Sequence, residues 1–134
     1  MFDRKTLLTA TASIVLGAGI ALGIQASIGP LHAQSTPAGI TVSEVNVKDM
    51  DAYKAWLPDV QKRIADHGGK YIAGGFNKTT SLTGDAPPNR VVIIQYPSVN
   101  AVKKWWQEVG ETDLKKAEKF ASFRVYAVEG VEQK

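Results

Sequence analysis

The sequence predicts an α+β domain of the ferredoxin-like type, with its elements in the order strand, helix, strand, strand, helix, strand. Apolar and polar residues alternate with the period of a strand near both ends of the domain, in 40–47 and in 122–130. Between these ends lie two stretches with apolar residues at helical spacing, and two strand-like runs separate them. This order is typical of two split β-α-β units that share one sheet.

The N-terminal segment, residues 1–33, differs from the rest of the chain. Arg4 and Lys5 precede an uncharged, mainly apolar run from residue 7 to 24, and a small residue at position 33 marks a cleavage point. This is the layout of a secretory signal peptide. An apolar run of this length can also stay in the bilayer, so a membrane anchor over 7–28 is the alternative. Both interpretations predict export of the folded domain, to the periplasm or out of the cell.

Residues 34–38 form a short polar linker, and 39–131 have the length of one small domain. The leader contains only Arg4, Lys5 and Asp3 of the chain's 16 basic and 13 acidic residues, so the domain is close to neutral. Its interspersed charges give no electrostatic case for nucleic acid as a partner. The chain has no cysteine, which excludes a disulfide framework, a thiolate metal site and a cysteine nucleophile.

The first strand is expected over 40–47, where Val45 and Val47 point to one side and Glu44 and Asn46 to the other. A helix follows at once, because apolar residues recur at helical spacing: Met50, Tyr53, Trp56, Leu57, Val60 and Ile64. Asp49 or Asp51 can cap its start. Pro58 removes one backbone donor, so the helix is expected to kink there or to restart at the proline.

The segment HGGKYIAGG, residues 67–75, has the glycine spacing of a phosphate-binding loop. Such a loop leads from a strand into a helix, whereas here a helix leads into a strand, so the phosphate interpretation fails. The first glycine pair instead predicts a left-handed end of the helix. A strand is expected over 70–82, and Gly74 and Gly75 predict a bulge or sharp bend within it.

Residues 83–90 are rich in turn formers and predict a surface loop. The next strand, 90–97, is apolar on both faces except at Gln95. Ser98 then caps a helix whose inner face carries Val102 and Trp105, together with Trp106.

The expected end of this helix is Gly110, and Thr112 is expected to cap a short polar helix after it. The last strand, 122–130, places Phe123, Val125 and Ala127 on one face and Arg124, Tyr126 and Val128 on the other.

Four segments together resemble a bacterial family catalogued as domain of unknown function 1330: DAYKAWLP, HGGKYIAGG, TGDAPPNRVVIIQYPSVNAVKKWW and FRVYAVEGV. The resemblance extends over about 39–131. It implies a dimeric α+β barrel, in which two ferredoxin-like units place their sheets face to face with the helices outside. A second copy of the chain is therefore the expected partner. The family has no agreed activity, so the resemblance indicates fold rather than function.

In such a barrel one face of each sheet packs on its own helices and the other lines the interior. We assign Val45 and Val47 to the helix side, which sends the polar residues of the other face to the interior: Glu44, Asn46, Gln95, Arg124 and Tyr126. Polar groups that converge in an apolar cavity would orient a small apolar or aromatic ligand. Tyr53, Tyr71 and the tryptophans, Trp105 among them, would form its walls. A structural ion pair between Glu44 and Arg124 is the alternative.

These expectations favour an exported, dimeric small-molecule-binding protein. One alternative is a cofactor-independent oxygenase or isomerase in the same cavity, with His67 or Glu44 as proton acceptor. Another is a structural or interaction module without a ligand. His67 is expected in the last turn of the first helix, where an interaction with the helix dipole is its structural alternative.

No metal and no cofactor are predicted. A single histidine in a domain without cysteine cannot form a zinc site of the common kinds. Related haem-degrading barrels use Asn, Trp and His in that chain order. Here the histidine of the domain, His67, precedes Trp105 and Trp106, so the order does not match.

Overall fold

A computed structural model of the chain describes residues 36–132. The predicted signal peptide or anchor, residues 1–33, lies outside the described residues. The helices and strands follow the predicted order: β1 (Gly39–Val47), α2 (Met50–Asp66), β2 (Lys70–Phe76), β3 (Arg90–Tyr96), α3 (Val99–Trp105), a π-helical turn (Trp106–Gly110), α4 (Glu111–Ala117) and β4 (Ala121–Glu129). The α+β class with a ferredoxin-like arrangement is therefore confirmed.

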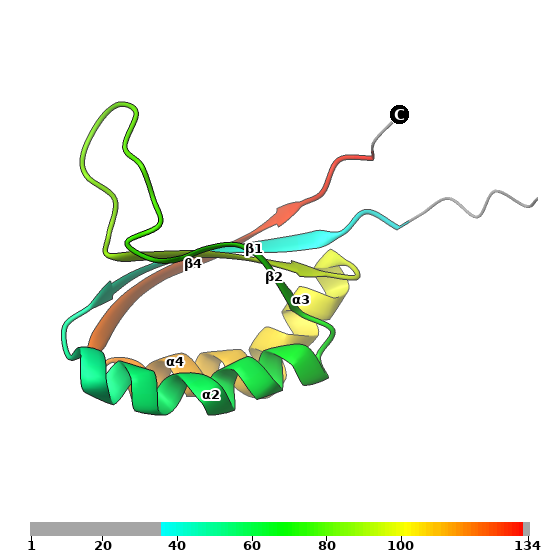
Figure 1. The fold of residues 1–134 in the computed structure, drawn as a ribbon. Coiled ribbons are helices and arrows are strands. Elements are labelled where there is room, and N and C mark those ends of the chain that lie inside the picture. The colour runs from blue at the N-terminus through cyan, green and yellow to red at the C-terminus, as the bar shows by residue number, and fades with distance from the viewer. Residues whose placement is uncertain (1–35, 133–134) are drawn as a thin grey trace, which may run out of the picture. The chain divides into compact units, whose positions relative to one another are not determined.

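The four strands form one antiparallel sheet in the order β2-β3-β1-β4. The helices lie together below one face of this sheet (Figure 1). β3 lies between β1 and β2, so α2 connects two strands that are not neighbours. β1 lies between β3 and β4, so the helical segment from α3 to α4 does the same. This is the split β-α-β arrangement, and it places β2 and β4 at the edges.

The core lies between the sheet and the helices. Val45 and Val47 of β1 are buried there, as the sequence predicts. Alternate residues of β3 and one face of each long helix complete it: Val92, Ile94, Tyr96, Tyr53, Val60, Ile64, Val102 and Trp105. No helix of residues 36–132 covers the second face of the sheet, which is called the uncovered face below (Figure 1). Alternation along the strands brings Glu44 and Asn46 to that uncovered face.

The predicted helix ends are confirmed where they depend on local chemistry. The backbone N–H of Ala52 donates to Asp49 Oδ1 at 3.1 Å, and the N–H of Ala101 donates to Ser98 Oγ at 3.1 Å. After α2, the N–H of Gly69 donates to the Ile64 carbonyl at 2.9 Å and Gly68 takes a φ of +81°. This pattern is the Schellman motif, and it explains the first glycine pair.

α2 continues through Pro58, so the predicted restart of the helix at the proline is wrong. Pro58 and Lys54, whose carbonyl loses its partner, both lie on the exposed side. Water can bond that carbonyl, and the buried residues before and after the proline hold the helix to the sheet.

β2 ends at Phe76, so the expected strand to Leu82 is too long. Asn77 has a φ of +52°, and its N–H donates to the Asn89 carbonyl at 2.8 Å, which closes the 77–89 loop. β2 is irregular, but not at the predicted glycine pair: its pairing with β3 shifts between Tyr71 and Ala73, whereas Gly74 and Gly75 stay in register with Val92 and Val91. Gly74 also has a positive φ, and a Cβ there would collide with the Val91 carbonyl oxygen.

Gly110 does not end the second helix, and Thr112 caps nothing, so both expectations are wrong. The chain passes from α3 through the π-helical turn into α4 without a break. Gly110 is buried, and a Cβ there would lie 3.0 Å from the indole ring of Trp105. The glycine is therefore required for close packing and not for a left-handed helix end.

Candidate functional site

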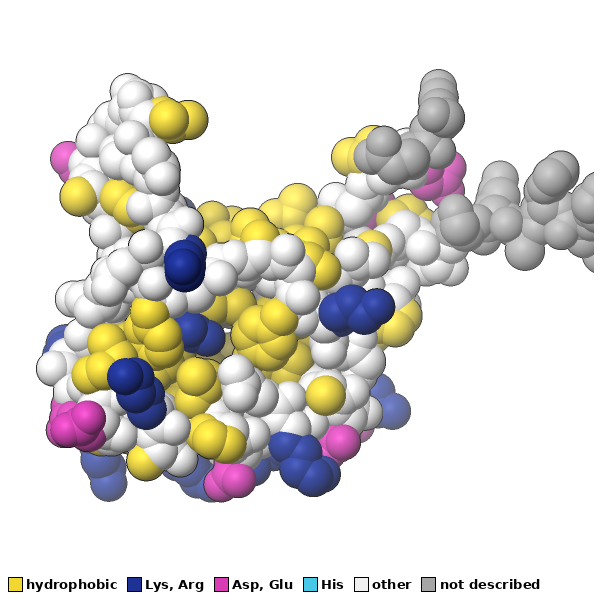
Figure 2. All heavy atoms as spheres, viewed as in Figure 1, with side chains coloured by type: hydrophobic (Ala, Val, Ile, Leu, Met, Phe, Trp, Pro, Cys, Tyr) yellow, Lys and Arg dark blue, Asp and Glu magenta, His cyan; other side chains and the backbone are white. Residues whose placement is uncertain are grey.

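A cavity of about 40 Å³ lies inside the domain, between the sheet and the helices. Its aromatic walls come from two strands, β2 and β4, and two helices, α2 and α3, and aliphatic side chains fill the remainder: Tyr53, Trp56, Tyr71, Trp105, Phe123, Leu57, Val60, Ile64, Leu114, Val45, Val92, Ile94 and Val125. Figure 2 shows hydrophobic side chains around a hollow between β2 and α2. The cavity has room for a few water molecules or for one small polar head group.

Among the described residues, Arg90 is the one charged residue of the cavity wall. It begins β3, and its alternation with Val92 and Ile94 turns its side chain towards the helices, where it is only 6 % exposed. The guanidinium carbon lies 4.4 Å from the ring centre of Phe76 and 5.7 Å from that of Tyr53. No carboxylate among residues 36–132 pairs with it, and its Nε is buried without a hydrogen-bond partner.

Sequence reasoning missed Arg90, although a signal was present. The run RVVIIQYP is predicted as a strand over 90–97 that is apolar except at Gln95, and Arg90 is also the last residue of the predicted loop 83–90, so its charge is assigned to neither face of the sheet. The same alternation that buries Val92 and Ile94 also buries a residue two places earlier. A charged residue at the buried phase of a strand was the available signal.

Further buried polar atoms around the cavity lack partners within the described residues. The indole Nε1 atoms of Trp56 and Trp105, both cavity residues, make no hydrogen bond. The hydroxyl of Tyr96 is also buried and makes no hydrogen bond within the described residues. Its ring centre lies 5.7 Å from that of Trp105. Buried donors of this kind are rare in folded proteins, so several in one place indicate a site that water or a ligand completes.

Two tyrosines bring protonated phenols to Arg90. Burial raises the pKa of Tyr53 and the nearby Arg90 cation lowers it, with a net rise. Burial likewise raises the pKa of Tyr71 to about 12, again against the influence of Arg90. Both phenols are therefore protonated at neutral pH and keep an O–H to donate.

The cavity reaches the surface beside β2. Tyr71, Arg90 and Val92 line both the cavity and an outer depression that runs along β2, and Gln61 of α2 borders that depression. The outer wall consists of backbone at Gly74 and Gly75. The Arg90 side chain thus stands between the interior and the surface.

The eight predicted ligand-binding residues divide between the two faces of the sheet. Tyr53, Tyr71 and Trp105 line the cavity on the helix side. The strand pairing places the other five on the uncovered face: Glu44, Asn46, Gln95, Arg124 and Tyr126. There Arg124 Nη1 lies 3.4 Å from Glu44 Oε2 on the neighbouring strand, and its guanidinium carbon lies 5.4 Å from the Tyr126 ring centre.

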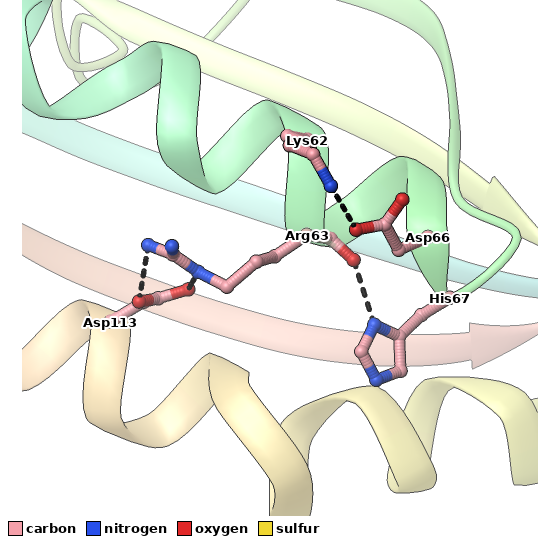
Figure 3. Close-up of polar contacts among 5 residues, drawn as sticks. All are labelled: Lys62, Arg63, Asp66, His67 and Asp113. Carbon is pink, nitrogen blue, oxygen red and sulfur yellow. Dashed lines mark hydrogen bonds and ion pairs between the residues drawn. The ribbon is translucent and has the colours of Figure 1, made fainter.

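His67 lies at the C-terminal end of α2 and is not part of the cavity wall. Its Nδ1 lies 2.7 Å from the Arg63 carbonyl oxygen, and its Nε2 lies 2.8 Å from Glu108 Oε2. The bond to the Arg63 carbonyl and then the bond to Glu108 raise the His67 pKa above 6.5. Figure 3 shows the ring turned towards the following helical segment. Both ring nitrogens are occupied, and the catalytic roles of His67 and Glu44 stay predictions.

Within residues 36–132, no three acidic or histidine side chains are grouped as ligands of a metal ion. The helices of the same region include none with the length and hydropathy of a membrane span.

Comparison with known proteins bears on the fold. The sequence model of the family described as Domain of unknown function (DUF1330) matches residues 38–131. A crystal structure of a protein of unknown function from Rhodopseudomonas palustris is 18% identical, with a TM-score of 0.54, over 86% of this chain and 94% of that chain. The methylated form of the Rhodopseudomonas palustris protein is 17% identical, with a TM-score of 0.57, over 85% of this chain and 91% of that chain.

A nipsnap family protein with unknown function from Agrobacterium tumefaciens is 14% identical, with a TM-score of 0.43, over 75% of this chain and 96% of that chain. No curated protein matches the chain. At these identities the two structures of the Rhodopseudomonas palustris protein support the fold alone.

Proposed function

This chain belongs to the DUF1330 family, and on that premise we propose that it is an exported, homodimeric protein that binds a small molecule in the cavity between its sheet and its helices. The observation that carries the proposal is the set of unpartnered buried donors around one apolar cavity: Arg90 Nε, Trp56 Nε1 and Trp105 Nε1. Few convergent polar groups in apolar walls are typical of ligand sites.

These buried donors need hydrogen-bond acceptors. A buried donor without a partner costs roughly 1–3 kcal/mol, and a charged donor costs more. A ligand with oxygen atoms inside the cavity would remove these costs, and its apolar part would extend outward past Tyr71 and Val92. The site proposed here therefore lies within one chain, on the helix side of the sheet, rather than between two sheets.

Support for a homodimer comes from the uncovered face of the sheet. Ile40, Val42, Val91 and Ile93 are only half-buried there, and Tyr126 and Val128 are 42% and 47% exposed. A second copy that packs against this face would bury these side chains by an isologous contact. Export is proposed from the sequence of residues 1–33.

The proposal is tested by native mass spectrometry of the purified chain, together with tryptophan emission during titration with small aromatic compounds. We expect bound mass, and a change of emission because Trp56 and Trp105 line the cavity. Ser43→Leu should abolish both effects, since Ser43 also lines the cavity. Ser81→Leu in the exposed 77–89 loop is the matched control. A chain that carries no bound mass and responds to no compound would contradict the proposal.

A further inference from the structure

The structure assigns a chemical class to the ligand: we infer that the cavity takes a small organic monocarboxylate, held by the guanidinium of Arg90. This inference rests on the proposed function of the cavity. It identifies Arg90 as the residue that selects an anion over a neutral molecule of the same shape.

The buried positive charge of Arg90 needs a negative charge to balance it. Of the residues between 36 and 132 that line the cavity, Arg90 alone is charged, and it is nine-tenths buried or more. An arginine cannot release its proton in a protein, so its positive charge must be matched by a partner or remain uncompensated. One buried positive charge matches one negative charge. A dianion such as phosphate would leave an excess negative charge in an apolar site.

A second buried charge in the same domain shows the usual solution. Asp113 is 3% exposed, and Arg63 donates to both of its carboxylate oxygens at 2.8 Å. Arg90 is buried to nearly the same degree, yet no acidic side chain in the described part of the chain reaches it. The fold therefore pairs one buried charge internally and leaves the other open to a ligand.

The aromatic neighbours of Arg90 fix the orientation of its guanidinium. Phe76 and Tyr53 lie against it as aromatic neighbours, which holds the side chain in place and favours its positive charge. Contact of an aromatic ring with the face of the planar group leaves its edge open to acceptors, and on that edge Nε is a buried donor without a partner among residues 36–132. These edge donors form the fork that matches the two oxygens of a carboxylate. The protonated phenols of Tyr53 and Tyr71 are further donors beside it.

Cation–π contact alone is a weaker explanation for Arg90. Such contacts recover only part of the cost of removing a guanidinium from water, and they do not satisfy its N–H groups. A carboxylate satisfies both charge and hydrogen bonds.

The size of the cavity also favours a carboxylate head group. A volume of about 40 Å³ is enough for a planar carboxylate but not for a large ligand. The rest of the ligand has a path outward, because Tyr71, Arg90 and Val92 also line the depression beside β2. A short aliphatic or aromatic acid meets both conditions.

The experiment compares benzoate with benzamide, its neutral counterpart of the same shape, by calorimetric titration of the full chain. Inorganic phosphate is the third probe. We expect benzoate to bind roughly tenfold more tightly than benzamide or more, because a charge-assisted bond is lost with the amide. Arg90→Met should remove this preference while benzamide binding persists, and Arg90→Lys should retain part of it. Lys54→Met, which removes an exposed charge from α2, should change neither affinity.

Equal affinities for benzoate and benzamide in the unchanged chain would overturn the inference and leave the proposed function standing. Binding of phosphate as tight as that of benzoate would overturn the carboxylate class. Failure of every probe to bind, together with no bound mass from native mass spectrometry, would remove the proposed function itself. The comparison of the two benzoyl probes needs no variant, so it decides the question even where Arg90→Met fails to fold.

Discussion

Arg63 and Asp113 join α2 to α4 through two hydrogen bonds, from Nε and Nη2 of the arginine to the two carboxylate oxygens, each 2.8 Å long (Figure 3). The pair is asymmetric in burial, because the Asp113 side chain is almost inaccessible whereas that of Arg63 is 35% exposed. Removing one partner therefore does not have the same consequence as removing the other. Arg63 can turn to water, but Asp113 cannot.

This asymmetry predicts that Arg63→Met destabilises the domain more than Asp113→Asn does. We expect losses of about 3 kcal/mol and about 1–2 kcal/mol in the free energy of unfolding, since a buried charge without a partner is the costlier outcome. Urea denaturation of both variants measures the difference. Glu111→Gln breaks the exposed pair with Lys115 and should change nothing measurable. Equal losses of stability for Arg63→Met and Asp113→Asn would contradict the prediction that the two partners differ in their cost of removal.

The hydrogen bonds of His67, first to the Arg63 carbonyl and then to Glu108, predict that stability falls as the pH rises. The His67 pKa is raised above its ordinary value of 6.5 in the folded domain. A raised pKa means that the folded state holds the proton more tightly than the unfolded state does. The stabilisation is therefore complete below pH 6.5 and is lost as the pH rises through the folded-state pKa.

Urea midpoints between pH 5.5 and 8.5 measure this dependence. The neighbouring Glu108 favours the protonated imidazole and Lys104 opposes it. Glu108→Gln should reduce the dependence on pH without removing the bond to the Arg63 carbonyl. The prediction would be wrong if the urea midpoint of the unchanged chain rose with pH over this range while that of His67→Gln did not. His67 would then stabilise the domain in its neutral form.

The contact between Gly110 and Trp105 predicts that Gly110→Ala destabilises the domain. Helix propensity alone would make alanine more stable than glycine by up to about 1 kcal/mol. A Cβ 3.0 Å from the indole ring forces Trp105 to move, and we expect a net loss of about 1–3 kcal/mol. Thermal unfolding followed by tryptophan fluorescence gives the sign.

A companion substitution, Thr112→Ala, separates the helix interior from a helix cap. Thr112 lies inside α4, so alanine should raise stability by a few tenths of a kcal/mol. An N-cap threonine would instead lose about 0.5–2 kcal/mol on the same change. The two outcomes differ in sign.

Arg90→Met should stabilise the domain in buffer without ligand, by about 1 kcal/mol. The substitution removes a buried charge that has no carboxylate partner among the described residues, and methionine has a similar length and no polar atoms. The midpoint of urea unfolding is the measurement. A marked loss of stability would mean that Arg90 has a structural partner, and that the cavity is complete without a ligand.

The uncovered face of the sheet predicts a dimer in solution. Light scattering at micromolar concentration should give twice the mass of the chain, and Ile93→Lys at the centre of that face should give a monomer. Lys54→Glu on the exposed side of α2 is the control for a change of charge. If the unchanged chain is a monomer, the homodimer proposal is wrong, while the site within each chain is unaffected.

The sequence by itself determined the features that depend on neighbours along the chain. Alternation separated Val45 from Glu44 and Phe123 from Arg124, because successive strand residues point to opposite faces. Asp49, Ser98 and Gly68 marked helix ends, because caps act on backbone groups within a few residues.

Tertiary structure alone decided the features that depend on what lies across the core. Gly110 is an example, because a glycine can either end a helix or make room for a neighbouring ring. The indole ring of Trp105, five residues earlier, packs against Gly110 and decides for the second role. The place of the cavity was decided in the same way. Tyr53, Tyr71 and Arg90 come from three elements, and only their packing shows that the guanidinium meets aromatic rings and no carboxylate of the described chain. A sequence pattern records which face a residue takes, but the partners on that face are set by long-range packing.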